Sequence, residues 1–202
     1  DIILSTAAQQ YGGFTVPEVD KILAPYAKKS YDKYISEFLK YSDESWSGRE
    51  ERAIEYALDK VRRDYDQGWQ GIEYKLNTVG SSRGDYPFVT VTLGLGTEQF
   101  EKMCTVSLLE VHQGGQGKAG HKKPVLFPKI VFLYDKEIHG PGKCCEDIFE
   151  AGVECSSKTM YPDWLSMSGQ GYISSMYKKY KKVIIVSISY MHDIFLQYLL
   201  IV

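Results

Sequence analysis

The chain has 202 residues, which suits one domain or one large piece of a bigger domain. Its hydrophobic content of 44% and its charged content of 25% are ordinary for a globular protein. A net charge of −2 at pH 7 gives no reason to expect a nucleic-acid partner, which usually shows as a basic face.

A long amphipathic helix is predicted from Val16 to Tyr41, because apolar side chains recur there at the spacing of one buried stripe. Thr15 is the expected cap, and Pro17 suits the first turn. Pro25 lies inside the pattern and is expected to kink the helix or to end its first part. Residues 1–14 have the pattern of a helix end that runs into a glycine turn, so we expect the chain to begin inside a longer protein.

A second helix is predicted from Arg49 to Gln70. Its expected stripe consists of Ile54, Ala57, Leu58, Val61, Tyr65 and Trp69. The polar segment Ser42–Gly48 joins the two helices, so residues 16–76 should form a helical hairpin. Such a hairpin can bury its stripes only against the rest of the protein or against a second subunit.

The second half of the chain alternates strands with helices. Phe88–Leu93 is rich in Val and Thr and is predicted to be a strand, with Thr97 as the cap of a helix over residues 98–112. Val125–Tyr134 is predicted to be a second strand, and its continuous apolar character suits burial on both faces. Pro128 inside this strand indicates a bulge or an edge position.

Two more helices are predicted, one over Glu146–Lys158 and one beginning at Gly171 and reaching Lys182. This alternation indicates βαβ units, a parallel sheet and an α/β fold over residues 86–180. Val183–Val202 is mostly apolar and has the length of a membrane span. Asp193 near its middle costs about 3 kcal/mol in a bilayer, so a span is disfavoured.

The four cysteines are Cys104, Cys144, Cys145 and Cys155. They form no C-x-x-C pair and have no ligand-like spacing from the four histidines, so we predict no metal site. Glu110 and His112 lie two residues apart on different faces of a predicted helix and do not form a metal site either. A disulfide between the adjacent Cys144 and Cys145 would be strained and is disfavoured. With no secretory signal at the start of the chain, we expect reduced thiols and a cytoplasmic location.

Three glycine-containing motifs invite a nucleotide-binding interpretation. GSSRGDYP at Gly80–Pro87 has the hydroxyls, the arginine and the backbone amides to wrap a phosphate, although the residues alone favour a turn before a strand. The glycine-rich segment Gly114–Pro124 lacks the glycine–lysine–hydroxyl run of a P-loop. Gly94 and Gly96 lie between a strand and a helix, without a convincingly placed third glycine or acidic residue.

Three longer segments carry a family resemblance. They are NTVGSSRGDYPFVTVTLGLGT (Asn77–Thr97), HKKPVLFPKIVFLYDKEIHGPGK (His121–Lys143) and ECSSKTMYPDWLS (Glu154–Ser166). Together they resemble the catalytic subunit of anaerobic, class III ribonucleotide reductases, which are glycyl radical enzymes. The resemblance extends from the opening AAQQYGGF to MYKKY, which ends at Tyr180. It implies that residues 1–180 are an internal piece of a ten-stranded α/β barrel that includes the helical hairpin. Pyruvate formate-lyase-like enzymes share this kind of barrel.

The resemblance also implies a reaction and its cofactors. The family reduces ribonucleoside triphosphates to deoxyribonucleotides for DNA replication, by glycyl and thiyl radical chemistry. An activase with an iron–sulfur cluster and S-adenosylmethionine makes the glycyl radical, and a structural zinc lies near the C-terminus of the parent enzyme. Allosteric ATP or deoxynucleotide effectors bind at the interface of a homodimer, and the hairpin resembles the helices of that interface. The reductant, formate or thioredoxin, is left open.

Two sets of site residues are predicted, the first from the phosphate-wrapping residue types of Gly80–Pro87 and the second from the resemblance. Ser81, Ser82 and Arg83 are the expected substrate-binding residues. SGQGYISSMYKKY, which ends at Tyr180, resembles the segment that carries effector information towards the active site. Within it, the residues that we assign to this communication are Gly169, Gly171 and Tyr172.

The chain departs from the family after Tyr180. Lys181 stands where the family has a glycine, and no Met-Gly-Cys-Arg loop follows, so no catalytic residue is assigned and the chain alone is predicted to be inactive. We interpret residues 181–202 as the product of a frameshift, a truncation or an assembly error. Two alternatives stay open: a nucleotide-binding or dimerising interaction module without catalysis, and a protein with a membrane tail anchor.

Overall fold

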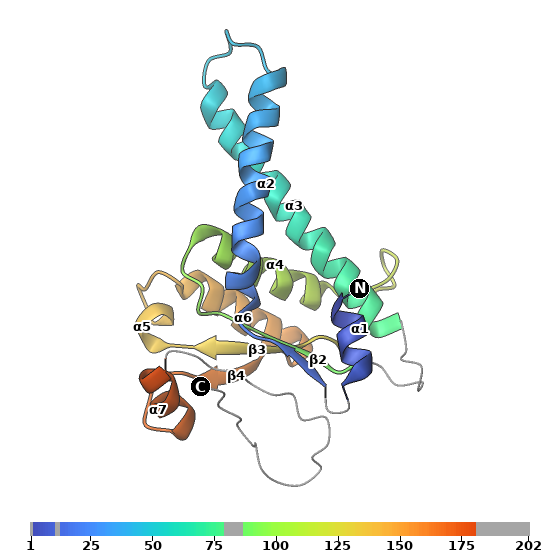
Figure 1. The fold of residues 1–202 in the computed structure, drawn as a ribbon, viewed down its shortest axis with the longest axis vertical. Coiled ribbons are helices and arrows are strands. Elements are labelled where there is room, and N and C mark those ends of the chain that lie inside the picture. The colour runs from blue at the N-terminus through green and yellow to red at the C-terminus, as the bar shows by residue number, and fades with distance from the viewer. Residues whose placement is uncertain (1, 11–12, 79–86, 181–202) are drawn as a thin grey trace.

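The computed structural model describes residues 2–10, 13–78 and 87–180, and the protein is built on a parallel sheet (Figure 1). Four strands follow one another across the sheet in chain order: β1 (Phe14–Val16), β2 (Val89–Leu93), β3 (Lys129–Tyr134) and β4 (Asp163–Ser166). Val91 in β2 lies opposite Val16 on one side and Ile130 on the other. The predicted α/β class and the predicted parallel sheet are confirmed.

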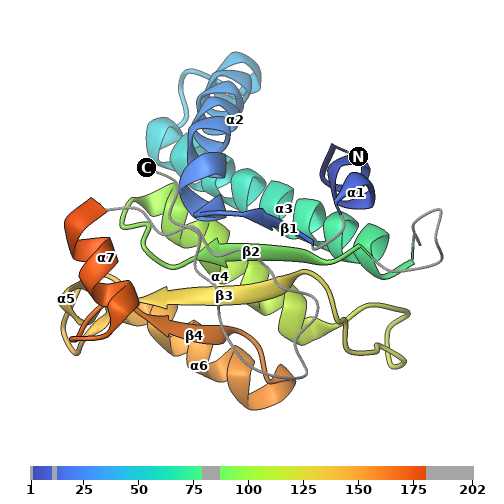
Figure 2. The same ribbon diagram turned by 60° about the horizontal axis from the view of Figure 1, so that its bottom comes forward.

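Seven helices in the described residues connect and cover the strands. They are α1 (Ile2–Gln9), α2 (Val19–Tyr41), α3 (Arg49–Thr78), α4 (Gln99–Gly114), α5 (Lys136–His139), α6 (Glu146–Thr159) and α7 (Tyr172–Tyr180). Helices α4 and α6 lie side by side against one face of the sheet, and α7 lies where the strands end (Figure 2). Helices α2 and α3 form a long hairpin that projects away from the sheet (Figure 1).

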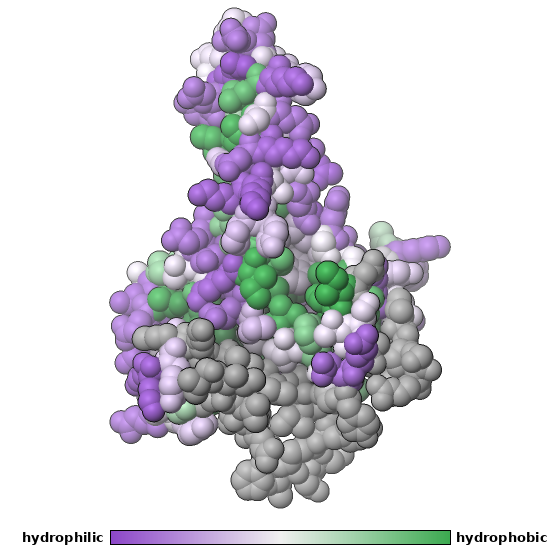
Figure 3. Space-filling model, viewed as in Figure 1, coloured by the Kyte–Doolittle hydropathy of each residue, from purple (hydrophilic) through white to green (hydrophobic). Residues whose placement is uncertain are grey.

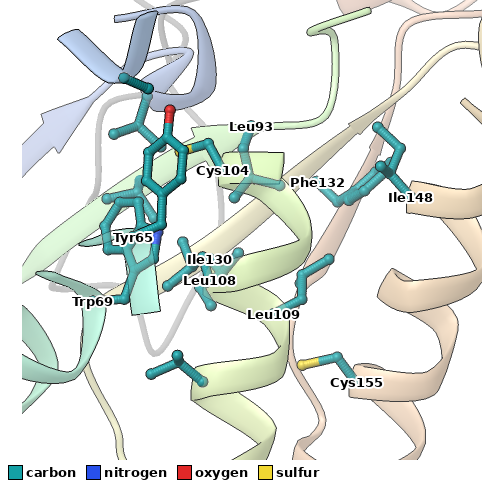
Figure 4. Close-up of a cluster of buried hydrophobic side chains, with 14 of the residues drawn as sticks. Tyr65, Trp69, Leu93, Cys104, Leu108, Leu109, Ile130, Phe132, Ile148 and Cys155 are labelled. Carbon is teal, nitrogen blue, oxygen red and sulfur yellow. The ribbon is translucent and has the colours of Figure 1, made fainter. Parts of the chain in front are cut away.

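The main core fills the space between the sheet, the covering helices and the base of the hairpin (Figure 4). Every residue of β2 is buried, as expected for an interior strand with both faces covered. The sheet contributes Leu93, Ile130 and Phe132, and the helices contribute Leu108, Leu109 and Ile148. Each of these six side chains has no exposed surface, and burying one such side chain stabilises the fold by roughly 1.5–3 kcal/mol.

The hairpin confirms most of the predicted stripe on its second helix. Ala57, Val61, Tyr65 and Trp69 are buried, and they recur every four residues along α3. Ile54 is 46% exposed instead, because the buried position on that turn belongs to the neighbouring residue, Ala53.

The first hairpin helix begins later than predicted. Phe14–Val16 forms the edge strand β1, so Thr15 pairs with Thr90 in the sheet and does not cap a helix. The N-cap is Glu18, in a left-handed conformation with φ 44°, and its backbone N–H donates to Thr92 Oγ1 at 2.7 Å. Pro25 does not end the helix, which continues to Tyr41 along α3 and α4.

Pro128 lies before its strand and marks neither a bulge nor an edge position, contrary to the prediction. Strand β3 begins at Lys129, after Pro128, and lies inside the sheet between β2 and β4. The proline therefore removes no hydrogen bond from the ladder. Residues before it are held by helix α3: Asn77 Nδ2 donates to the Phe127 carbonyl at 2.7 Å, and Asn77 Oδ1 accepts from Leu126 N–H at 2.9 Å. These contacts also explain why α3 continues to Thr78 and not only to Gln70.

Three short elements were not predicted from the sequence: strands β1 and β4 and the short helix α5. Two further helix boundaries differ. Helix α4 is capped at Glu98 and not at Thr97, because Glu101 Oε2 accepts from both of their backbone N–H groups. Helix α7 begins at Tyr172, and residues 181 and 182 of the predicted helix lie outside the described residues.

Across residues 2–10, 13–78 and 87–180, no helix is long and apolar enough to cross a membrane. The apolar segment 183–202 lies outside these residues.

Candidate functional site at the carboxyl end of the sheet

The three longer strands of the parallel sheet end at one edge, beside α5 and α7 (Figure 2). Strand β2 runs into Gly94, β3 runs into Asp135, and β4 runs into Met167 and Ser168. In open α/β sheets, ligands bind outside the carboxyl ends of the strands, which makes this edge the first place to look for a site.

A cavity of about 510 Å³ lies at this edge. It is lined mostly by polar and charged residues of the loops after β3 and β4 and of helix α7: Asp135, Lys136, Glu137, Met167, Ser168, Gly169, Gln170, Tyr177 and Lys178. The wall is ordered by hydrogen bonds, because Ser168 Oγ donates to Asp135 Oδ1 at 2.7 Å and accepts from Lys136 N–H at 2.8 Å. Lys178 Nζ donates to the Gly169 carbonyl at 2.9 Å. Such a cavity presents both charge signs to a polar ligand.

The predicted communication residues are only partly brought together. Gly169 lines the cavity and has φ 121°, a conformation that favours glycine. Gly171 and Tyr172 stand at the start of α7 and do not line it, and Tyr172 is 59% exposed. The predicted substrate-binding residues, Ser81, Ser82 and Arg83, lie outside the described residues.

Sequence reasoning missed a buried carboxylate that joins the hairpin to this edge. Asp20, in the first turn of α2, has no exposed surface, and its Oδ2 accepts from Gly94 N–H at 3.0 Å and from Gly96 N–H at 3.1 Å. Burial raises the pKa of Asp20, and the bonds from these glycines oppose that rise. The burial of Asp20 could have been predicted from the sequence, because Asp20 lies on the same helical face as the apolar Leu23 and Ala27.

His139 fastens the same turn from the other side. Its Nε2 lies 2.7 Å from the Gly94 carbonyl, which can only accept, so Nε2 carries a proton and donates to it. In the neutral ring Nδ1 then accepts from Asp135 N–H at 3.0 Å, and it also lies 3.0 Å from the Asp135 carbonyl. Burial lowers the pKa of His139 and favours this neutral form. Gly94 is thus held by Asp20 through its N–H and by His139 through its carbonyl.

A second polar cluster lies between α3 and α4. Glu73 and His112 are both buried, with Glu73 Oε1 at 2.8 Å from His112 Nδ1. Gln116 Nε2 donates to Glu73 Oε2 at 3.2 Å, which ties the loop after α4 to α3. Glu110, two residues before His112, pairs instead with Arg62. The two residues therefore face different partners, as their spacing predicted.

The hairpin carries an apolar cavity of about 270 Å³ near its base. Its lining comes from facing sides of α2 and α3: Leu23, Tyr26, Ala27, Ser30, Val61, Asp64, Tyr65, Gly68, Trp69 and Ile72. Hydrophobic residues gather on the surface where the hairpin meets the body (Figure 3). Tyr26 lines this cavity and is 65% exposed.

These features define an α/β protein whose parallel sheet carries a polar cavity at its carboxyl edge and a projecting helical hairpin. The family model described as "Anaerobic ribonucleoside-triphosphate reductase" matches residues 1–187, so the chain belongs to this family. The match continues past Tyr180, where we expected the resemblance to end.

Relatives with the same description agree. The chain is 37% identical to the anaerobic ribonucleoside-triphosphate reductase of Enterobacteria phage T4 over 169 residues, which are 82% of this chain and 26% of that protein. It is 35% identical over 166 residues to the proteins of Haemophilus influenzae and Escherichia coli, again 82% of this chain and 22% of each of them. The chain thus spans about a quarter of the length of the curated relatives it matches.

Proposed function

We propose that this chain is part of the catalytic barrel of an anaerobic ribonucleoside-triphosphate reductase and contributes four strands to a ten-stranded α/β barrel. Membership of the family over residues 1–187 carries the proposal. Parallel strands in chain order, linked through helices, are the pattern of successive barrel strands. Among the described residues, β1 and β4 each pair with one strand only, so each offers an edge for a further strand.

The reaction of the whole protein is then the reduction of ribonucleoside triphosphates to deoxyribonucleotides, in the cytoplasm. A glycyl radical made by an iron–sulfur and S-adenosylmethionine activase supplies the radical chemistry, and a structural zinc belongs to the whole protein. None of these groups is assigned to this chain. Cys104 and Cys155 are buried in the main core, where they act as small apolar side chains.

The chain alone should therefore not reduce nucleotides. The test is to incubate the purified chain anaerobically with activase, S-adenosylmethionine, a ribonucleoside triphosphate and either formate or thioredoxin, and to measure deoxyribonucleotide formation. Product above the level of a sample without the chain would refute the prediction.

The hairpin is proposed as the face of a homodimer that binds ATP or deoxynucleotide effectors. The apolar cavity between α2 and α3 supports this role, because its lining residues can be covered by a partner's helices. A dimerising, nucleotide-binding module without catalysis is the second candidate, and the same cavity favours it. Turnover by the whole protein separates the two candidates, since only the reductase converts its nucleotide.

A glycine in the cavity wall gives a sharp test of the dimer. A Cβ added at Gly68 meets nothing within 4 Å, so Gly68→Leu should fold normally and fill the cavity mouth. Gly71→Leu is the matched control, because Gly71 is exposed on the same helix, is equally unobstructed and does not line the cavity. Sedimentation equilibrium should show dimerisation weakened about tenfold or more, roughly 1.4 kcal/mol, in the first variant only. Equal dimerisation of both variants and the unchanged chain would remove the hairpin from the interface.

We also propose that the segment ending at Tyr180 carries effector information to the cavity at the sheet edge. Gly169 lines that cavity, and Ser174 Oγ in α7 donates to the Ser166 carbonyl at 3.1 Å, so a movement of α7 reaches the end of β4. Addition of ATP or a deoxynucleotide should change hydrogen exchange over residues 166–180. A change confined to the hairpin would contradict the proposed route.

A further inference from the structure

Two adjacent thiols meet at the start of helix α6. Cys144 Sγ and Cys145 Sγ are 3.6 Å apart. Cys144 is exposed to solvent, whereas Cys145 has no exposed surface. The pair thus combines one sulfur that a small oxidant can reach with a second sulfur in contact with it.

The backbone around the pair is held in place on several sides. Cys145 N–H donates to the Ile138 carbonyl at 2.9 Å, and Lys102 Nζ donates to the Cys144 carbonyl at 2.7 Å. Lys102 also pairs with Asp147 at 2.8 Å. The buried Cys145 Sγ lies 3.6 Å from the Gly96 carbonyl, in the turn that Asp20 caps. Because the backbone is fixed, the two sulfurs stay close without a covalent bond.

The two thiols have different reactivities. Burial raises the pKa of Cys145 to about 12, so this sulfur stays a protonated thiol near neutral pH. The exposed Cys144 is then the sulfur that an oxidant meets first. A nucleophile held in contact with a reactive centre has a large effective concentration, so Cys145 can react with an oxidised Cys144 despite its low thiolate fraction.

We propose that Cys144 and Cys145 form a reversible oxidation site, at which a peroxide converts the pair into a vicinal disulfide. The Cys144 thiolate attacks one oxygen of hydrogen peroxide, the O–O bond breaks, and the products are a Cys144 sulfenic acid and hydroxide. Cys145 sulfur then attacks the Cys144 sulfur, and the sulfenic hydroxyl leaves as water with the Cys145 proton. Two thiols are oxidised by two electrons, and one peroxide is reduced to two waters.

Strain makes this product reversible. Adjacent residues have Cα atoms about 3.8 Å apart, whereas ordinary disulfides join Cα atoms about 4.4–6.8 Å apart, so a bond between Cys144 and Cys145 is strained. Strained disulfides have higher reduction potentials and are the labile ones, so a dithiol reductant should reopen the bond. The proposal departs from the sequence-based expectation, which disfavoured any disulfide between these two cysteines, because the contact between their sulfurs allows a transient one.

The test uses the unmodified 202-residue chain. It is treated with hydrogen peroxide, unfolded, alkylated with N-ethylmaleimide and cleaved after glutamate, and the peptides are measured by mass spectrometry. Cleavage after Glu137 and Glu146 gives the peptide of residues 138–146, which contains both vicinal cysteines and neither Cys104 nor Cys155. We expect this peptide to lose two hydrogen masses and to escape alkylation, and dithiothreitol to restore two alkylated cysteines.

The other cysteines and one variant act as controls. Cys104 and Cys155 are buried and should remain fully alkylated in the same sample. In Cys145→Ser no resolving thiol is present, so dimedone should trap Cys144 sulfenic acid at least about tenfold more than in the unchanged chain. The proposal is overturned if the 138–146 peptide stays fully alkylated, if Cys144 bonds only to another chain, or if Cys145→Ser yields no more dimedone adduct than the unchanged chain.

Discussion

Replacing Asp20 by alanine should destabilise the protein more than replacing any exposed acid of the same helix. Asp20 Oδ2 accepts two hydrogen bonds, from Gly94 N–H at 3.0 Å and from Gly96 N–H at 3.1 Å. Both glycines are buried, so alanine at position 20 leaves two donors without their partner and without ready access to water. Lys21 N–H, a third donor to Asp20, keeps its bond to the Glu18 carbonyl.

The size of the loss follows from these two donors. A buried donor left unsatisfied costs about 1–3 kcal/mol, which gives roughly 2–6 kcal/mol for both. Burial raises the pKa of Asp20, so removing the carboxylate also relieves a desolvation cost and offsets part of this loss. We expect Asp20→Ala to lower the free energy of unfolding by about 3 kcal/mol. For a chain of this length, the melting temperature should fall by about 6–12 °C.

Thermal and urea unfolding, followed by circular dichroism, would measure this effect. Asp20→Asn is the informative second variant, because its amide oxygen can still accept both bonds and it should lose only about 1 kcal/mol. Asp32→Ala, at an exposed position of α2, is the control and should change stability by less than about 0.5 kcal/mol. If Asp20→Ala were no less stable than Asp32→Ala, the claim that Asp20 fastens the hairpin to the sheet edge would be wrong.

The raised pKa of Asp20 has a pH consequence whose sign can be stated. The folded state binds the Asp20 proton more tightly than the unfolded state does, for which the usual pKa is 3.8. The group therefore stabilises the fold fully below about pH 3.8, and this contribution is lost as the pH rises through the folded-state pKa. Asn does not titrate, so the stability of Asp20→Asn does not change with pH through this residue. The variant should therefore become more stable relative to the unchanged chain between pH 4 and pH 7. A constant difference over this range would contradict the assigned direction.

Three further substitutions test other parts of the fold. Burial lowers the pKa of His139, so between its folded-state and unfolded-state pKa values the unfolded state binds more protons. The free energy of unfolding should therefore fall as the pH drops below about 6.5. His139→Gln should reduce this pH dependence when urea unfolding is measured at pH 5 and at pH 7. Gly152→Val should lower the free energy of unfolding by about 1–3 kcal/mol, because a Cβ added at Gly152 would lie only 2.9 Å from the Trp164 ring. An unchanged melting temperature would show that Trp164 can move aside at little cost. Glu73→Ala leaves buried His112 without its carboxylate and should cost about 3–5 kcal/mol, whereas a loss under 1 kcal/mol would mean that the pair contributes little.

Local patterns predicted the longer elements well. The spacing of Ala57, Val61, Tyr65 and Trp69 identified the buried side of α3, because helical periodicity is set by the helix itself. The Val- and Thr-rich run of β2 gave a buried strand for a similar reason. Strand β1 has three residues and β4 has four, which is too short for a period-two pattern to stand out from its surroundings.

The sequence by itself determined the α/β class, the helical hairpin and the family, because each depends on residues close together in the chain. Tertiary structure decided the contacts of the sheet edge. Asp20 reaches a glycine that is 74 positions away, and Glu73 reaches His112 across 39 positions. Periodicity records which side of an element is buried, but not which distant segment covers it. A buried carboxylate therefore acquires its partners, and its perturbed pKa, only when the chain folds.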